Sequence, residues 1–469
     1  MLSMVECIRA GENVSDFVVG RFNDFRLQKT GALLFKRIGT MFSTCIKTLA
    51  GERKLEVSFG RFLQHDNVTI EEMSKTLAEK TNLNCKSRKH VLAIQDTVES
   101  TYPTQWDKKH LFGTGAHPSV KSILAHPSII VDAFNKDILG IGSIKLWTRK
   151  DKELIPKHLR SIEEKESIRW IEIAEETKKN ITHGAIITHI TDREGDIYEL
   201  LSRIPDERNH FIVRSKSDRI LLDGYHLSEH MAEVAIAGKY EINLPAITGV
   251  RAERVAKVTI KFSKVDLTTN TPESKNTKEH LELTCIEIAE IGGFSSGVAP
   301  VFWRLLTTHD VTNTEEAKQI AIWYTWRWII EQLFRTMKKK GFKIEESQIE
   351  TPDSLMKLFL LGLAAAVQVL CLVYARDGKS NRPALEIFSK EELIVLLLML
   401  KKVEGKTLKQ KNPHKRNTLS WAAWIIARLG SWYPGASHPP GPITMFKGLK
   451  RFNTIFEAWE ILKKDTCIG

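Results

Sequence analysis

Short apolar, β-branched segments that alternate with helical stretches constrain the fold of this chain more than any other feature of its sequence. Five such segments lie between residues 90 and 217, and each has the length and composition of a buried strand. They are HVLAIQDT (90–97), SIIVDAF (128–134), DILGIGSIKLW (137–147), HGAIITHITD (183–192) and HFIVRSKS (210–217). A turn signal, Asn135-Lys136, separates the second segment from the third, and the helical segment DIYELLSRI follows the fourth. This alternation predicts an α/β fold in which helices flank a mixed sheet.

The regions on either side of these strands have other patterns. Residues 1–80 are helical in pattern, and Thr69 with Glu72 forms a capping box before a helix. The segment SFGRFLQHDNVTIEEMSK resembles two helices joined by a short turn, which can present a helix to DNA but is more often a structural hairpin. Residues from about 219 to 310 indicate a β-rich insertion, and residues 418–469 a Trp-rich helical module.

A capping box of Thr312 and Glu315 opens a long helix that is predicted to end near residue 341, and one face of this helix is chemically unusual. At about 100° per residue, Tyr324, Arg327, Glu331 and Lys338 fall within an arc of about 60°. The opposite side is an apolar stripe suited to packing on a sheet. One phenol, one carboxylate and two cations therefore lie in a row, although a surface helix with one incidental ion pair would give the same pattern.

Two aspartates stand directly after apolar strand segments, Asp96 after VLAIQ and Asp192 after AIITHIT. One carboxylate cannot hold Mg²⁺ alone, because the ion requires an octahedron of oxygen ligands. Together with Glu331, the two aspartates could converge on a pair of divalent ions about 4 Å apart, as in-line phosphoryl transfer requires. Each aspartate taken singly is explained equally well as a turn-capping residue.

These residues carry a resemblance to a known family. Tyr324, Arg327, Glu331 and Lys338 match in type and spacing the signature of the insertion-sequence (IS-four) group of DDE transposases, which includes the Tn-five transposase, and TDREGDIYE resembles that group's second-aspartate motif. Other segments resemble family segments in family order, namely SFGRFLQHDNV, the IQDT strand, HFIVRSKS, FWRLLTT and PPGPITMFKGLKRFNTIFEAWEI.

The resemblance implies a domain layout. It places a helical DNA-binding domain at 1–80, a ribonuclease H-like catalytic domain with an inserted β-subdomain at 81–375, and a helical dimerisation domain at 376–469.

The resemblance also implies roles for individual residues. It makes Asp96, Asp192 and Glu331 the catalytic, metal-binding acids, and it gives DNA contacts to a second set. That set is Tyr324, Arg327, Lys338, Trp303, Arg214, Lys216 and Arg61. Trp303 resembles an aromatic side chain that receives a flipped base, an arrangement suited to hairpin formation. A packed strand residue is the alternative for Trp303, and a solvated strand face is the alternative for Arg214 and Lys216.

The resemblance thus implies a Mg²⁺-dependent transposase, with Mn²⁺ able to substitute, that nicks DNA, forms and opens hairpins, and transfers strands. Its expected partners are transposon ends, target DNA and a second copy of the chain. A ribonuclease H-type nuclease without joining activity and a non-catalytic DNA-binding regulator are the alternatives.

The charge and hydropathy of the chain agree with this prediction without deciding it. A formal net charge of +12 favours a polyanionic partner. The apolar run from Leu358 to Ala375 is long enough to raise the question of a membrane span, but a single late run in a chain of mixed polarity favours a buried helix. The amino terminus lacks the pattern of a signal peptide. The expectation is a cytoplasmic, nucleoid-associated protein of a prokaryote that does not bind membranes.

Overall fold

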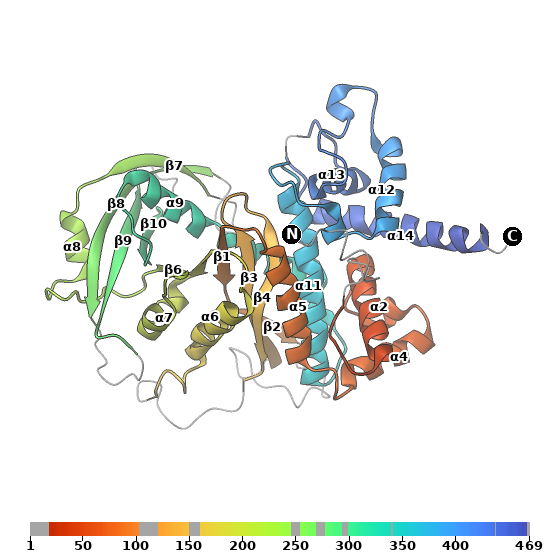
Figure 1. Cartoon of the computed structure of the whole chain (residues 1–469), viewed down its shortest axis with the longest axis horizontal. Coiled ribbons are helices and arrows are strands. Elements are labelled where there is room, and N and C mark those ends of the chain that lie inside the picture. The colour runs from red at the N-terminus through yellow and green to blue at the C-terminus, as the bar shows by residue number, and fades with distance from the viewer. Residues whose placement is uncertain are drawn as a thin grey trace.

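The structure is a computed structural model that describes residues 18–102, 121–149, 160–244, 254–268, 277–292, 299–338, 341–436 and 438–466. Within these residues, one mixed sheet of ten strands organises the fold (Figure 1). Its strands run in the order β2-β3-β1-β5-β6-β10-β9-β8-β7, and β4 pairs with β3. The prediction of a mixed sheet flanked by helices is confirmed.

The strand bounds show where the sequence pattern was accurate and where it fell short. The strands are β1 (His90–Gln95), β2 (Val98–Tyr102), β3 (Lys121–Asp132), β4 (Ile138–Trp147), β5 (Ile186–Thr191), β6 (Asn209–Arg214), β7 (Gly238–Leu244), β8 (Arg254–Thr268), β9 (His280–Glu290) and β10 (Phe302–Thr307). The sequence pattern missed β2, and it started β3 too late because polar residues open that strand. The turn at Lys136 is present, with a left-handed φ of 66°.

Strand direction divides the sheet into two kinds of pairing. The strands β2, β1 and β4 run antiparallel to β3, whereas β1, β5 and β6 run parallel to one another. From β6 onward, β10, β9, β8 and β7 continue the sheet with antiparallel pairs. The parallel strands bring their carboxyl ends to one edge of the sheet.

Helices cover both faces of the sheet, and the burial of β1 shows the consequence. All six of its residues are buried. Leu92 and Ile94 belong to the core shared with α11 (Pro352–Ala375), whereas Val91 and Ala93 belong to the core on the opposite face. Parallel strands covered on both faces are expected to be continuously apolar. The remaining α-helices are α2 (Phe25–Met41), α3 (Ile46–Ala50), α4 (Arg53–Gln64), α5 (Ile70–Asn84), α6 (Arg169–Asn180), α7 (Tyr198–Arg203), α8 (Leu227–Glu233), α9 (Thr314–Thr325), α10 (Trp328–Met337), α12 (Lys390–Val403), α13 (Leu419–Leu429) and α14 (Pro442–Thr466).

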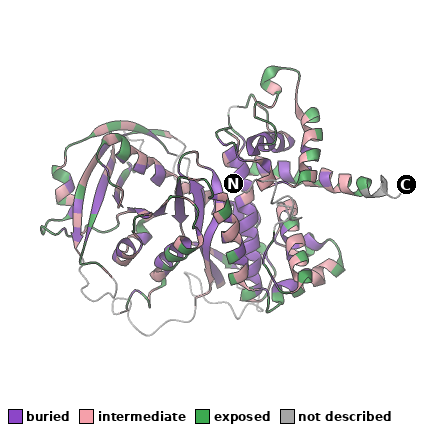
Figure 2. Cartoon of the chain, in the orientation of Figure 1, coloured by how far each residue is buried: buried purple, intermediate pink, exposed green. Residues whose placement is uncertain are grey.

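Helix α11 is the central packing element of the molecule. It contacts β4 of the sheet, the amino-terminal helices α2, α4 and α5, and the carboxy-terminal helices α13 and α14 (Figure 1). Figure 2 shows it buried along most of its length. Among the described residues it is the one helix long and apolar enough to cross a membrane, but 89% of its most apolar window is buried inside the protein. The structure therefore agrees with the predicted buried helix.

The amino-terminal hairpin matches the predicted pattern, and its second helix is partly covered. Helices α4 and α5 are joined by residues 65–69, and the Thr69 side chain accepts a hydrogen bond from the Glu72 amide. The Glu72 carboxylate binds the Arg21 amide, so the reciprocal half of the predicted capping box is absent. Helix α5 packs against β4 and α11, which leaves only part of its surface open.

The predicted single helix over 312–341 is wrong, because the structure breaks it into α9 and α10. At the break, the amides of Trp326 and Arg327 bond to carbonyls three residues earlier, which is a tightened 3₁₀-type turn. The capping residue also differs. The pattern of Thr312 and Glu315 predicts the cap one residue early, whereas Asn313 accepts from the Glu316 amide at 3.0 Å.

Other local elements were not predicted. Helix α8 interrupts the region expected to be entirely strands and loops, since Leu227 and Met231 provide a buried apolar face. Single 3₁₀ turns occupy Glu166–Ile168, Arg193–Gly195, Ile344–Glu346, Ala384–Glu386 and Leu408–Gln410.

Candidate active site

The two candidate aspartates lie at the ends of neighbouring parallel strands. Asp96 directly follows β1 and Asp192 directly follows β5. The two strands pair with Ile94 opposite Ile190, so the same register continued by two residues sets Asp96 opposite Asp192. Neighbouring strands are about 4.8 Å apart. The fold therefore brings together two carboxylates that are far apart in the sequence.

Glu331 reaches this edge from α10, and Arg327 connects it to Asp96. The Arg327 guanidinium donates from Nη1 to Asp96 Oδ2 at 3.1 Å and from Nη2 to Glu331 Oε1 at 2.6 Å. The tightened turn between α9 and α10 carries Arg327, with its side chain 13% exposed. A cation thus already lies between two of the three candidate acids.

The electrostatics of Asp96 indicate how closely the acids gather. Burial raises its pKa to about 7, and the negative charges of Asp192 and Glu331 act in the same direction. The Arg327 guanidinium opposes this rise. All three acids therefore lie within electrostatic reach of one another, in a setting where a further positive charge would be favourable.

The carboxylates of Asp96, Asp192 and Glu331 are suitable ligands for a divalent ion, but their present positions are too far apart to bind one together. Among the described residues, no three Asp, Glu, His or Cys side chains are close enough to hold a metal ion. One oxygen of each aspartate accepts from a backbone amide, Asp96 Oδ1 from Thr97 at 2.7 Å and Asp192 Oδ1 from Glu194 at 2.8 Å, and Arg327 occupies the second oxygen of Asp96. Carboxylate oxygens are the ligands that Mg²⁺ prefers. These residues could hold such an ion if Arg327 released its two partners.

A cavity of about 310 Å³ opens beside Glu331. Its walls include Arg214, Trp303, Tyr324, Arg327 and Glu331. The Trp303 ring packs edge-on against Tyr324, with centroids 5.4 Å apart, and Trp303 is only 8% exposed. Burial raises the Tyr324 pKa against the opposing effect of Arg327 and Arg214. Four residues of the predicted DNA-binding set thus line one cavity next to an acid.

The remaining predicted contacts lie outside this cavity. Lys338 at the end of α10 donates to the Glu99 carbonyl at 2.6 Å. Lys216 follows β6 with an exposed side chain. Arg61 is exposed on α4, and α11 lies between α4 and the sheet (Figure 1). The fold does not bring Arg61 to the acids.

Two further side chains at the site were not singled out from the sequence. Trp328 lines the cavity, and its place directly after Arg327 in WYTWRW could have drawn attention to it. Arg169, at the start of α6, donates to both Thr97 and Glu194, the neighbours of the two aspartates. No spacing rule connects Arg169 to either motif.

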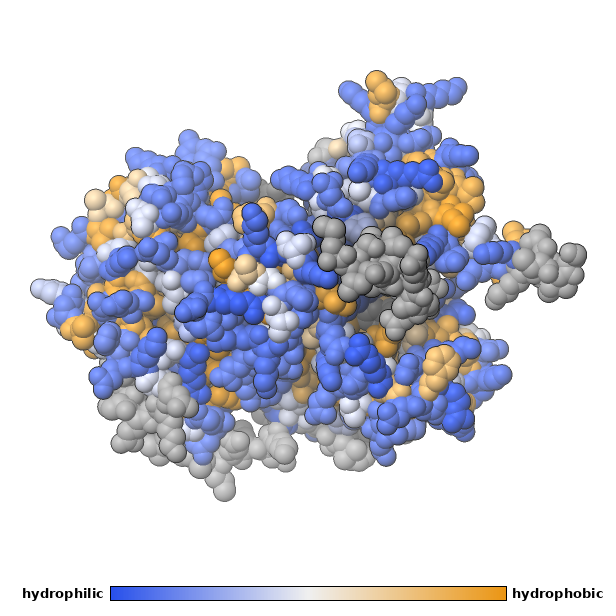
Figure 3. All heavy atoms as spheres, in the orientation of Figure 1, coloured by the Kyte–Doolittle hydropathy of each residue, from blue (hydrophilic) through white to orange (hydrophobic). Residues whose placement is uncertain are grey.

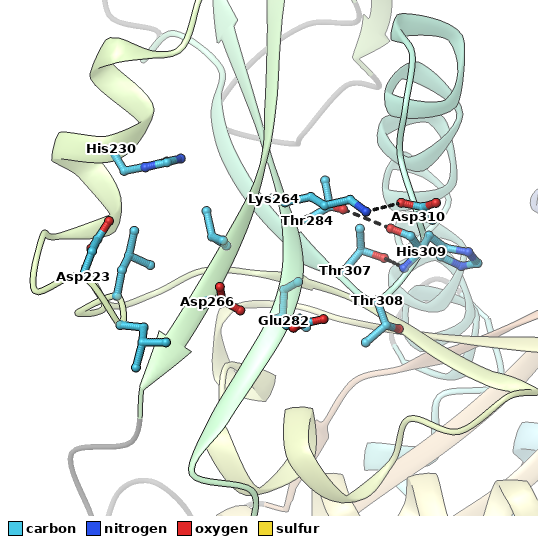
Figure 4. A pocket seen from close by; sticks show the side chains of 14 residues that line it. Asp223, His230, Lys264, Asp266, Glu282, Thr284, Thr307, Thr308, His309 and Asp310 are labelled. Carbon is cyan, nitrogen blue, oxygen red and sulfur yellow. Dashed lines mark hydrogen bonds and ion pairs between the residues drawn. The ribbon is translucent and has the colours of Figure 1, made fainter.

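A larger cavity, of about 740 Å³, lies on the β8–β10 part of the sheet. Figure 4 shows its polar lining, which includes Asp223, Asp266, Glu282 and Asp310 together with Lys264. Lys264 pairs with Asp310 at 3.0 Å. This predominance of carboxylates repels a phosphate backbone, and the candidate acids Asp96, Asp192 and Glu331 are not among its lining residues.

One family of known proteins matches part of this chain. The family model described as a transposase DDE domain matches residues 164–368. The match supports a DDE transposase. The matched stretch contains Asp192, the cavity residues and Glu331, whereas Asp96 precedes it. Transposases with a DDE domain generally use divalent metal ions and act on DNA.

A solved structure, described as the cryo-EM structure of the piggyBac transposase synaptic complex with hairpin DNA, is similar over 74% of this chain. The sequences are 10% identical and the TM-score is 0.33. The similar region spans 66% of that chain, just under two thirds of its length.

Proposed function

We propose that this chain is a cut-and-paste DNA transposase of the insertion-sequence (IS-four) group, with a ribonuclease H-like core. The observation that carries the proposal is that Asp96 and Asp192 follow paired parallel strands and that Arg327 joins Asp96 to Glu331. A cavity lined by aromatic and cationic side chains lies beside them. The antiparallel strands β4-β3-β1 continued by the parallel strands β5 and β6 support the core assignment.

In this proposal Asp96, Asp192 and Glu331 hold divalent ions, Mg²⁺ or Mn²⁺ in its place. When bound, such ions supply activation of an oxygen nucleophile and stabilisation of the leaving oxygen. The part of Arg327 is to keep the carboxylates together in the free protein and then to release them. Once released, its guanidinium is free to bind a DNA phosphate in bidentate fashion.

The other predicted residues, inside and outside the cavity, bind and orient DNA. Tyr324 and Lys338 contact phosphates at the element end, and Arg214 and Lys216 contact the backbone. Trp303 stacks on an extruded base, which requires the base to enter the cavity and reach a ring that now packs on Tyr324. Arg61 on α4 contacts DNA outside the catalytic pocket.

The reaction is one displacement repeated with different oxygens. Water attacks first and leaves a 3′ hydroxyl. That hydroxyl then attacks the opposite strand to form a hairpin, water opens the hairpin, and the freed 3′ hydroxyl attacks target DNA. In every step one P–O bond forms as the bond to a leaving 3′ oxygen breaks, so a single pocket is sufficient.

The proposal extends to domains and partners. Residues 1–80 bind DNA, residues 81–375 catalyse, with a β-rich insertion at about 219–310, and residues 376–469 join two copies at paired DNA ends. Ile394 and Leu398 on α12 are 51% and 46% exposed, and Figure 3 shows a hydrophobic patch over that part of the surface. Such a patch supports a homodimer. The proposed location is the cytoplasm, on nucleoid DNA, without membrane binding.

The decisive test is end cleavage by the Glu331→Gln variant. Purified protein is incubated with DNA flanking the encoding gene, with and without Mg²⁺, and products are resolved on denaturing gels. The proposal expects nicks and hairpins from the unaltered protein, and binding without cleavage from Glu331→Gln.

Asp310→Asn, in the larger acidic cavity, is the matched control and should cleave normally. Cleavage by Glu331→Gln in Mg²⁺ would refute the proposed site. A pre-cut end that is never joined to target would point to a nuclease, and metal-independent binding with no cleavage would point to a regulator.

A further inference from the structure

The side chain of Arg169 makes three hydrogen bonds at the base of the candidate site. Nε donates to the Thr97 hydroxyl at 2.9 Å, Nη2 to Glu194 Oε2 at 2.7 Å, and Nη1 to the Glu166 carbonyl at 3.0 Å. The side chain is 10% exposed, and the guanidinium lies over the Trp170 ring, 5.6 Å from its centroid. Arg169 therefore has a fixed position with each nitrogen committed.

Two of these partners stand next to a candidate metal ligand. Thr97 follows Asp96 and donates its amide to Asp96 Oδ1, and the Glu194 amide donates to Asp192 Oδ1 in the same way. Arg169 thus joins, through their side chains, the two residues whose backbone amides bond to the aspartates. The register of β1 and β5 places the two carboxylates at the same level along the strands. The hydrogen bonds of Arg169 hold the two turns that follow these strands, and the turns orient the carboxylates.

The Thr97 end of this connection is held from behind by a buried histidine. His126 Nδ1 lies 2.8 Å from the Thr97 hydroxyl, and His126 is fully buried on β3. Burial keeps the His126 pKa well below its usual value, so the ring is neutral and Nδ1 can accept the hydroxyl proton. Because Thr97 donates to His126, its lone pair is directed to Arg169.

The ion pair of Arg169 with Glu194 is not needed for the stability of the fold. Glu194 is 63% exposed, and an ion pair with one partner in solvent contributes little to folding. A rigid guanidinium fork that joins two turns is better suited to fixing geometry, and a lysine in its place could reach only one partner.

We propose that Arg169 is a positioning residue that sets the separation and aim of Asp96 and Asp192 for divalent ion binding. The inference rests on the proposed function of those aspartates. It assigns to the arginine an effect on metal affinity, exerted through Thr97 and Glu194 and without contact to the ion. Residues that orient metal ligands in this way commonly change metal affinity by about 10–100-fold when substituted.

The test measures Mn²⁺ affinity directly, by electron paramagnetic resonance of free Mn²⁺, in the full chain without DNA. Arg169→Gln should weaken binding by about 10–100-fold, and Arg169→Lys should weaken it almost as much despite its charge. Glu194→Gln should weaken it less, and it covers the case in which Arg169→Gln does not fold. Combined with Arg169→Gln, it should add nothing further.

The matched control is Arg203→Gln. Arg203 on α7 is 15% exposed and pairs with Glu163, which is 57% exposed, so the pair resembles Arg169 with Glu194 in burial. Mn²⁺ affinity should be unchanged in this variant.

Equal affinity in the Arg169 variants, the Glu194 variant and the unaltered protein would overturn the inference, as would absence of Mn²⁺ binding in the unaltered protein. End cleavage is measured separately on the same preparations. A protein that binds Mn²⁺ through Arg169-dependent geometry but cleaves no DNA would retain this inference and lose the proposed function.

Discussion

Replacing Arg327 with glutamine should destabilise the metal-free protein and leave it nearly unaffected in Mg²⁺. The substitution removes the positive charge that Asp96 and Glu331 share, with contacts of 3.1 and 2.6 Å. A divalent ion held by the same carboxylates would replace that charge. The variant therefore separates the two roles assigned to the site, namely binding Arg327 and binding metal.

The size of the effect follows from exposure and pKa. Glu331 is 43% exposed, so its pairing contributes only about 0–1 kcal/mol. Asp96 is 20% exposed, and loss of the guanidinium leaves it to take up a proton. Because its folded pKa is about 7 even beside Arg327, protonation one pH unit above that value costs about 1.4 kcal/mol. The sum is about 2 kcal/mol at mildly alkaline pH, and the Asp96 part disappears below the folded pKa.

Thermal unfolding followed by circular dichroism measures this difference. At about 2–4 °C per kcal/mol for a unit of 150–250 residues, the variant should melt about 4–8 °C lower without metal. Mg²⁺ at ten times its Kd should raise the free energy of unfolding by about 1.4 kcal/mol. This increase should be larger in the variant than in the unaltered protein, because the unaltered protein must first separate its carboxylates from Arg327.

Arg254→Gln provides the control, since Arg254 pairs with the buried Glu290 on the neighbouring strand, far along the sheet from β1. Its deficit should be the same with and without Mg²⁺. If the Arg327→Gln deficit is equally indifferent to Mg²⁺, the carboxylates around Arg327 do not form the metal site.

Three further substitutions test other parts of the structure. Asn313→Ala should lower the free energy of unfolding by about 1 kcal/mol in urea titrations, because it removes the cap of α9, and Asn313→Asp should restore it. His189 is fully buried with its pKa lowered to about 4, so its contribution to stability should be complete above its unfolded pKa of about 6.5 and fall below that pH, by up to about 2 kcal/mol at pH 5. His189→Gln should make the acid loss of stability shallower by that amount, with the rest coming from other buried histidines such as His126, and an unchanged slope would contradict this prediction. Trp303→Ala should suppress hairpin products more than first-strand nicks on denaturing gels, and equal loss of both would assign Trp303 a packing role.

The strand-end acids could be predicted from sequence because the signal is local. An apolar run that finishes on Asp96 or Asp192 marks both the strand and the edge where its carboxylate emerges. The parallel pairing that makes the two acids neighbours could not be predicted in the same way, because β2, β3, β4 and α6 lie between β1 and β5 in the sequence.

The break between α9 and α10 could not be predicted in this way. A single 3₁₀-type turn and a turn of α-helix are both right-handed, and replacing one by the other hardly changes the spacing of apolar residues along the sequence. The sequence around Trp326 and Arg327 therefore does not reveal the break. The connection from Arg169 to Thr97 joins residues 72 apart in sequence and depends on how α6 packs beneath the sheet. Only tertiary packing determines such a contact.

The position of α11 has a practical consequence for anyone dissecting this protein. Its leucines and alanines are enclosed by the sheet on one side and by helices from both chain termini on the others. Lys357 also reaches back to the carbonyls of Leu63 and His65 at the end of α4. A fragment that starts at β1 would lack α2, α4 and α5, so the apolar face of α11 that these helices cover would be exposed to water and would promote aggregation. Point substitutions in the chain of 469 residues are therefore better suited to its biochemistry than truncations are.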